Sequence, residues 1–116
     1  MPVSLVVDDE PSIRKYVSTI LQREDFKTLE AEDGARALQI VEALGGRVDL
    51  IVTDIQMPNG DGLTLARAVR RLFPAVPVIL VSGNAQPDAA FEFVEKPFSP
   101  SAILQAVRKV SATIPA

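Results

Sequence analysis

Four acidic residues stand at the positions of this sequence that are best suited to chemistry. Asp8, Asp9 and Glu10 follow a short apolar run, and Asp54 follows another apolar run in the middle of the chain. The sequence contains no cysteine and no histidine, which excludes thiol chemistry, disulfides, zinc fingers and imidazole base catalysis. Any chemistry of this chain must therefore use oxygen atoms and lysine.

Each of these acids also has an ordinary structural explanation when it is considered alone. Acids directly before a helix, such as Asp8 to Glu10, commonly cap the first amides and interact favourably with the helix dipole. An aspartate at the end of a strand, such as Asp54, is commonly a turn residue. A functional site is indicated only if the fold brings these acids together.

Short apolar runs alternate with amphipathic helical patterns along the whole chain. The runs at 50–52 and 76–81 are almost continuously apolar, as in central strands, whereas 26–31 alternates as in a half-buried edge strand. Strands are expected at 3–7, 26–31, 50–52, 76–81 and 91–94, with amphipathic helices after the first, second, third and fifth. This alternation predicts one domain over 1–116 with a doubly wound α/β fold, a parallel sheet covered on both faces.

The right-handed crossover rule favours the flavodoxin-like strand order 2-1-3-4-5 for five such strands. In this order the first and third strands are neighbours, so Asp8, Asp9 and Asp54 meet at the carboxyl edge of the sheet, where ligands bind in such folds. Carboxylates about 4 Å apart repel by about 4 kcal/mol at an effective dielectric near 20. A hard divalent cation relieves this repulsion, and oxygen ligands favour Mg²⁺, or Mn²⁺, over zinc and copper.

A cation beside a carboxylate is also what phosphoryl transfer requires, which makes Asp54 the expected nucleophile of an acyl phosphate. Two further strands end at the same carboxyl edge of the sheet. Ser82 is either a turn-forming serine before Gly83 or a hydroxyl donor to a phosphoryl oxygen. Lys96 is either a solvated surface charge or a fixed cation for the developing phosphate charge. Phe93, taken alone, is a core residue.

Five short motifs in this order resemble the receiver domain of two-component response regulators, and the resemblance covers essentially the whole chain. The motifs are Val6-Val7-Asp8-Asp9-Glu10, Asp54-Ile55-Gln56-Met57-Pro58, Gly60 to Gly62, Ser82-Gly83 and Lys96-Pro97-Phe98. The resemblance implies that Asp54 accepts a phosphoryl group. It also implies that Asp9 binds Mg²⁺ directly, that Asp8 binds it mainly through water, and that Asp54 and the backbone carbonyl of Gln56 complete the protein ligands.

The resemblance implies roles for the remaining positions as well. Ser82 and Lys96 would hold the phosphoryl oxygens. Phe93 matches the switch aromatic of the family, which turns inward as the hydroxyl moves toward the phosphate. The side chains of Gln56 and Asn84 would flank the acyl phosphate and tune its hydrolysis.

One segment departs from the pattern of this family. Only nine residues, Ser82 to Ala90, separate the fourth and fifth apolar runs, whereas a parallel crossover with its helix needs about 10 to 12. We therefore expect the fourth helix to be shortened or missing and 84–88 to be mainly a loop. This loss would expose an apolar patch between the third and last helices, which a partner or a second copy in a homodimer could cover.

Composition sets limits on function. Of the 116 residues, 47% are hydrophobic and 23% charged, which predicts a globular chain and excludes disorder. Twelve basic residues against fifteen acidic ones give a net charge of −3, so neither nucleic acid nor a membrane is an expected partner. The first residues do not read as a secretion signal, and we expect a cytoplasmic location and no output domain on this chain.

The sequence thus predicts a phosphorylation-dependent switch that a histidine kinase or a phosphotransfer protein modifies on Asp54, and that an unknown downstream protein reads. Such a switch catalyses only its own phosphorylation and dephosphorylation. Two alternatives keep the fold: a phosphorylation-independent interaction module, and a phosphoryl relay or sink. A haloacid dehalogenase-like phosphatase is disfavoured, because Gln56 stands where such enzymes carry a second acid and the chain has no room for a substrate cap.

Overall fold

Five parallel strands form one sheet in the order β2-β1-β3-β4-β5, as predicted from the sequence. The computed structural model describes residues 2–57, 61–83 and 90–111. The strands are β1 (Val3–Val7), β2 (Lys27–Ala31), β3 (Leu50–Asp54), β4 (Val78–Ser82) and β5 (Glu92–Glu95). The helices are α1 (Pro11–Gln22), α2 (Gly34–Ala43), α3 (Gly62–Leu72) and α4 (Pro100–Ser111). The α/β flavodoxin-like fold is therefore confirmed.

The bounds of β1 agree with the sequence-based bounds, and those of the other four strands differ by one or two residues. β4 begins at Val78 and not at Val76, because the Val76 N–H donates to the Phe73 carbonyl in a turn and Pro77 has no N–H to donate. β3 and β4 extend to Asp54 and Ser82, so these two polar residues are the last residues of their strands.

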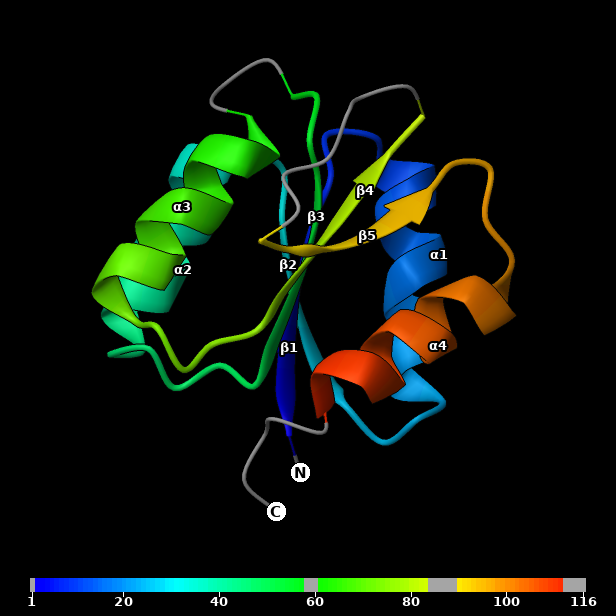
Figure 1. Ribbon diagram of the computed structural model, residues 1–116, viewed down its shortest axis with the longest axis horizontal. Helices are drawn as coiled ribbons and strands as arrows, with labels where there is room; N and C mark the ends of the chain where they lie inside the picture. Colours follow the sequence, from blue (N-terminus) through cyan, green and yellow to red (C-terminus); the bar gives the residue numbers. More distant parts are fainter. Residues whose placement is uncertain (1, 58–60, 84–89, 112–116) are drawn as a thin grey trace.

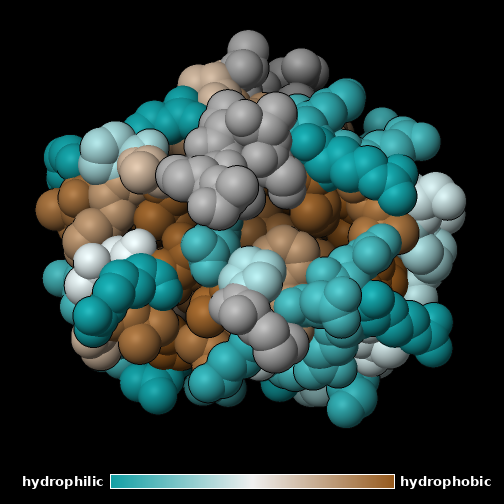
Figure 2. Space-filling view, turned by 90° about the horizontal axis from the view of Figure 1, so that it is seen from below, coloured by the Kyte–Doolittle hydropathy of each residue, from teal (hydrophilic) through white to brown (hydrophobic). Residues whose placement is uncertain are grey.

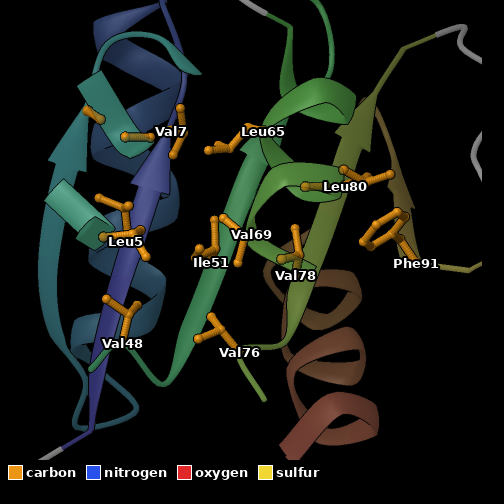
Figure 3. Packing of buried hydrophobic residues seen from close by; sticks show 14 of the residues in the cluster. Leu5, Val7, Val48, Ile51, Leu65, Val69, Val76, Val78, Leu80 and Phe91 are labelled. Atoms are coloured by element: carbon orange, nitrogen blue, oxygen red, sulfur yellow. The ribbon is translucent and has the colours of Figure 1, made fainter. Parts of the chain in front are cut away.

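The helices lie in two layers, one on each face of the sheet (Figure 1). α2 and α3 cover one face, and their apolar residues pack with alternate residues of the strands, such as Leu5, Ile51 and Leu80 (Figure 3). α1 and α4 cover the other face over Val52 and Ile79. Every residue of β3 and β4 is buried, as expected of strands covered on both sides. This rigid centre fixes the positions of the strand ends.

β4 is followed by β5 with no helix between them in the described residues, and the loop predicted at 84–88 lies outside them. The apolar patch expected here is not found among the side chains that the structure describes. Phe91 is only 8% exposed and belongs to the apolar cluster under α2 and α3, the Arg70 guanidinium of α3 lies 4.0 Å from its ring centroid, and Phe93 is partly buried. The long, stacked guanidinium covers part of the face that a helix would cover. The homodimer expected through this face stays a prediction.

The acids singled out from the sequence lie at one end of the sheet and not at the other. Figure 2 shows the amino end, where hydrophobic residues gather in the middle and hydrophilic residues lie mainly toward the rim. The acids singled out from the sequence all lie at the opposite, carboxyl end, because each follows or ends a parallel strand. The candidate site is therefore at the carboxyl edge.

Candidate functional site

Three carboxylates meet where β1 and β3 end side by side. Val7 pairs with Thr53 in the parallel ladder, so Asp8 and Asp54 are the next residues along two neighbouring strands. One carboxylate oxygen from each of Asp8, Asp9 and Asp54 lies within 4.8 Å of the others, and this group could hold a metal ion. Asp8 and Asp54 are 4% and 7% exposed, whereas Asp9 faces solvent. The cluster is thus buried on one side and open on the other.

The Lys96 ammonium group lies between the two buried acids. Its Nζ is 3.6 Å from Asp8 Oδ2 and 3.4 Å from Asp54 Oδ2, with the lysine side chain 26% exposed. Lys96 follows β5, and its backbone N–H donates to the Ser82 carbonyl at 2.9 Å, which holds the start of this loop against β4. Of the two interpretations of Lys96 left open by the sequence, the structure favours a fixed cation at the site.

The environment of Asp8 disfavours the ionised form of its carboxyl group. Burial raises the pKa of its carboxyl above the ordinary 3.8, and the negative charges of Asp54 and Asp9 act in the same direction. The hydrogen bond that the Glu10 N–H donates to Asp8 Oδ1 at 2.9 Å, and the charge of Lys96, partly oppose this increase in pKa. Ionised Asp8 is therefore a destabilising group in the metal-free fold.

We predict that Asp8→Asn raises the thermal midpoint of the metal-free chain by a few degrees at pH 7. The pKa of the Asp8 carboxyl is higher in the folded chain than in the unfolded chain, so its protonated form stabilises the fold. This stabilisation is lost as pH rises from about 3.8 through the raised pKa of the folded state. The gain from the substitution should therefore vanish below about pH 3.8. Thermal melts in EDTA across pH measure this difference, and a pH-independent gain, or a lower midpoint at pH 7, would contradict it.

The backbone around Asp54 is held tightly by the start of α3. The N–H of Gly62, the first residue of α3, donates to the Ile55 carbonyl at 2.8 Å, and Asp61 caps the helix by accepting from the Thr64 N–H at 2.7 Å. A Cβ on Gly62 would lie 1.9 Å from the Asp54 carbonyl oxygen, so only glycine permits this close approach. The helix start thus fixes the orientation of Asp54.

The other predicted site residues lie on β4 and β5 or close to Asp54 in the chain, with one exception. Ser82 is the buried last residue of β4, one position beyond the Val81 that pairs with Asp54. The Gln56 N–H points to Asp54 Oδ1 at 3.4 Å, and its side chain is exposed. Phe93 lies on β5, partly buried against the cluster under α2 and α3. Asn84 lies outside the described residues.

Sequence reasoning missed two contributors to this geometry. The Arg14 guanidinium on α1 donates to the Asp8 carbonyl, and no pattern in a single sequence distinguishes this residue from a solvated helix arginine. Gly62 was noted only as part of a loop motif, although its proximity to Asp54 is what requires glycine. Both contacts join the end of a strand to the helix that follows it, and a single sequence does not show how closely those two elements approach.

With this geometry established, comparison with known proteins identifies the family. The family model of the response regulator receiver domain matches residues 4–108. The chain belongs to the response regulator receiver domain family. Receiver domains serve phosphorylation-dependent signalling and interact with histidine kinases and downstream effectors.

Individual relatives support the same family. The chain is 39% identical over 114 residues to the sensor kinase CckA of Brucella abortus (strain 2308). The aligned region covers 91% of this receiver domain but only 12% of that kinase. The crystal structure of a receiver domain from a hybrid histidine kinase CckA matches with a TM-score of 0.82 and 31% identity, covering 93% of this chain and 97% of that one. TrrA of Thermotoga maritima, in complex with Mg²⁺ and BeF, matches with a TM-score of 0.84 and 34% identity, covering 95% and 99%.

None of the helices in the described part of this receiver domain combines the length and the apolar character that crossing a bilayer requires.

Proposed function

We propose that Asp54 of this receiver domain accepts a phosphoryl group from a protein histidine in the presence of Mg²⁺, and that the modified state is read by another protein. The observation that carries this proposal is the meeting of three carboxylates within 4.8 Å, with the Lys96 ammonium between Asp8 and Asp54. A cation site beside a carboxylate, with a second cation fixed nearby, is what stabilises the charge of a transferring phosphoryl group.

The residues present fit a hard divalent cation. Asp8 and Asp9 with Asp54 offer only carboxylate oxygens, and the Gln56 backbone carbonyl is a further candidate ligand. The Mg²⁺ and BeF complex of the related TrrA supports the choice of Mg²⁺, with Mn²⁺ as the alternative. When bound, Mg²⁺ would neutralise phosphoryl oxygens, so that an anionic nucleophile can approach phosphorus.

Asp54 is the proposed nucleophile because its neighbours are better placed to bind the cation and fix charge. A carboxylate oxygen of Asp54 forms a bond to phosphorus, the bond from phosphorus to the donor nitrogen breaks, and the nitrogen leaves with its electron pair. Lys96 would bind a phosphoryl oxygen once its contact with Asp54 is replaced. The chain would catalyse only this transfer and the hydrolysis of the product.

The proposed switch links Asp54 to β4 and β5. The Ser82 hydroxyl, at the buried end of β4, would bind a phosphoryl oxygen and move toward Asp54, and Phe93 on β5 would turn further into the space under α3. The partly buried position of Phe93 supports this role, since part of the ring is still exposed and can become buried. The modified state is favoured because it alone makes the contacts of Ser82 and Lys96 with the phosphoryl group.

The test of this function uses the parent chain and a small donor. Incubation with phosphoramidate and Mg²⁺ should add one phosphoryl group, seen by intact-mass measurement, and EDTA should prevent the addition. Phosphoramidate carries no acetyl group, so lysine acetylation cannot imitate the result. If the parent gains no phosphoryl group although it binds Mg²⁺, the phosphorylation-independent interaction module becomes the better account.

Lys96→Met is expected to slow phosphorylation by phosphoramidate about 100-fold, because removing one preorganised charge from a transferring group costs roughly 10² to 10³ in rate. Lys109→Met is the matched control. Lys109 is 69% exposed and pairs with Glu92 at 3.6 Å, remote from the acids. Rates followed by intact mass should be unchanged in the control, and an equally fast Lys96→Met would refute the role of Lys96.

The surface next to Lys96 is suited to a protein donor. An apolar hollow there is lined by Ile13 and Tyr16 of α1 together with Pro97 and Phe98 of the loop after β5. The Tyr16 ring stacks on Phe98 with centroids 5.8 Å apart and is 40% exposed. A donor histidine must approach Asp54 from this carboxyl edge, so we assign the hollow to the apolar side chains around that histidine.

Tyr16→Ala should therefore reduce phosphoryl transfer from a histidine kinase about tenfold, the effect of losing one central apolar contact, and leave transfer from phosphoramidate unchanged. Leu72→Ala is the matched control, since Leu72 of α3 is the other exposed large apolar residue of the described part, at 46%. Transfer profiling against the histidine kinases of the source organism gives the comparison. Equal losses with both variants, or a loss with phosphoramidate as well, would reject this docking surface.

A further inference from the structure

Arg14 links α1, the end of β1 and β2 beside the acidic cluster. Its Nη1 donates to the Asp8 backbone carbonyl at 2.8 Å, and its Nε donates to Glu30 Oε1 at 2.9 Å. Arg14 lies in α1, Asp8 directly follows β1, and Glu30 belongs to β2, which pairs with β1. The side chain of Arg14 is only 20% exposed, although it carries a full charge. One guanidinium thus holds the β1–α1 turn against the neighbouring strand.

The group that Arg14 holds is the peptide between the first two acids. The Asp8 carbonyl and the Asp9 N–H belong to the same planar unit, so fixing the carbonyl oxygen fixes the direction from which Asp9 extends. A second contact joins the same turn to β2, because the Asp8 N–H donates to the Ala31 carbonyl at 3.2 Å. Arg14 therefore controls how the exposed Asp9 carboxylate is presented beside the buried Asp8.

The charge of Arg14 would by itself act against this site. A cation next to three carboxylates lowers their attraction for a divalent ion. Glu30 compensates for this charge and also orients the planar guanidinium, a geometry that lysine cannot reproduce with one ammonium group. The geometric and the electrostatic effects of Arg14 on cation binding therefore have opposite signs.

We propose that Arg14 is a positioning residue for the divalent cation site, which orients the Asp8–Asp9 peptide while Glu30 fixes and neutralises its guanidinium. This inference rests on the proposed binding of Mg²⁺ by Asp8, Asp9 and Asp54. Residues that orient metal ligands without touching the metal typically contribute 10-fold to 100-fold to affinity.

The test is titration calorimetry of the metal-free chain with Mg²⁺. Arg14→Met should weaken Mg²⁺ binding about tenfold. Lys15→Met removes the same charge from the adjacent, exposed position of α1 and should leave the affinity unchanged or slightly higher. An affinity of Arg14→Met equal to or higher than that of the parent would overturn the inference, since loss of a nearby cation alone predicts that result.

Arg14→Lys keeps the charge and provides a second test if Arg14→Met folds poorly. The variant should bind Mg²⁺ more weakly than the parent, because one ammonium group cannot hold Asp8 and Glu30 in the same geometry. Equal affinity of Arg14→Lys and the parent would also overturn the inference. Failure of the parent itself to bind Mg²⁺ would contradict the proposed function, so the two failures are distinguishable.

Discussion

Asp54→Asn is expected to abolish phosphorylation of this receiver domain by phosphoramidate and Mg²⁺. The amide is nearly the same size as the carboxylate but has no anionic oxygen to attack phosphorus, so chemistry should be lost without loss of the fold. The substitution also removes one buried charge 3.4 Å from Lys96, and only a small change in stability is expected. Intact-mass measurement should show the added phosphoryl group in the parent and none in the variant.

Asp33→Asn is the control for this substitution. Asp33 caps α2 by accepting from the Arg36 N–H at 2.8 Å, and asparagine caps a helix nearly as well. The control should gain the phosphoryl group like the parent. Equal modification of Asp54→Asn and the parent would show that another residue carries the group.

Gly62→Ala is expected to destabilise the fold by about 3 kcal/mol, near the upper end for an added methyl group in a closely packed position. Its Cβ would lie 1.9 Å from the Asp54 carbonyl oxygen and 2.9 Å from Thr53 Oγ1, so β3 and α3 must separate. This corresponds to a thermal midpoint lower by roughly 10 °C. Because the separation displaces Asp54, phosphorylation should also slow at temperatures where the variant remains folded.

Gly83→Ala provides the matched control close to the same site. Among the described residues, a Cβ on Gly83 would have the Lys96 Cβ at 3.9 Å as its nearest neighbour, which is ordinary van der Waals contact. Its thermal midpoint should stay within a few degrees of the parent. If Gly62→Ala and Gly83→Ala have the same thermal midpoint, α3 does not approach Asp54 closely enough to require glycine at position 62.

The sequence was sufficient for the strand order and for the meeting of the acids. Periodicity located the strands, the right-handed crossover rule placed β1 beside β3, and parallel strands necessarily bring Asp8 and Asp54 to one edge. The shortness of the segment between β4 and β5 also predicted correctly that no full helix separates them among the described residues. These inferences depend on local pattern and chain direction, which a single sequence contains.

The sequence was insufficient where a long side chain reaches across elements. The contact of the Arg70 guanidinium of α3 with the Phe91 ring was not expected from the sequence, because no pattern specifies the direction in which that side chain extends. The contacts of Arg14 with Asp8 and Glu30 depend likewise on the rotamer of one arginine. Such contacts are set by packing in three dimensions, and helical spacing gives only the face on which the residue begins.

The most direct test of the central claim is to locate the phosphoryl group on the chain. Borohydride reduces an acyl phosphate of aspartate to homoserine, which peptide sequencing by mass spectrometry then places at one residue. After phosphorylation in Mg²⁺, we predict homoserine at position 54 and unchanged aspartate at positions 8 and 9. Homoserine at position 8 or 9, or its absence from a chain that has gained phosphoryl mass, would contradict the account.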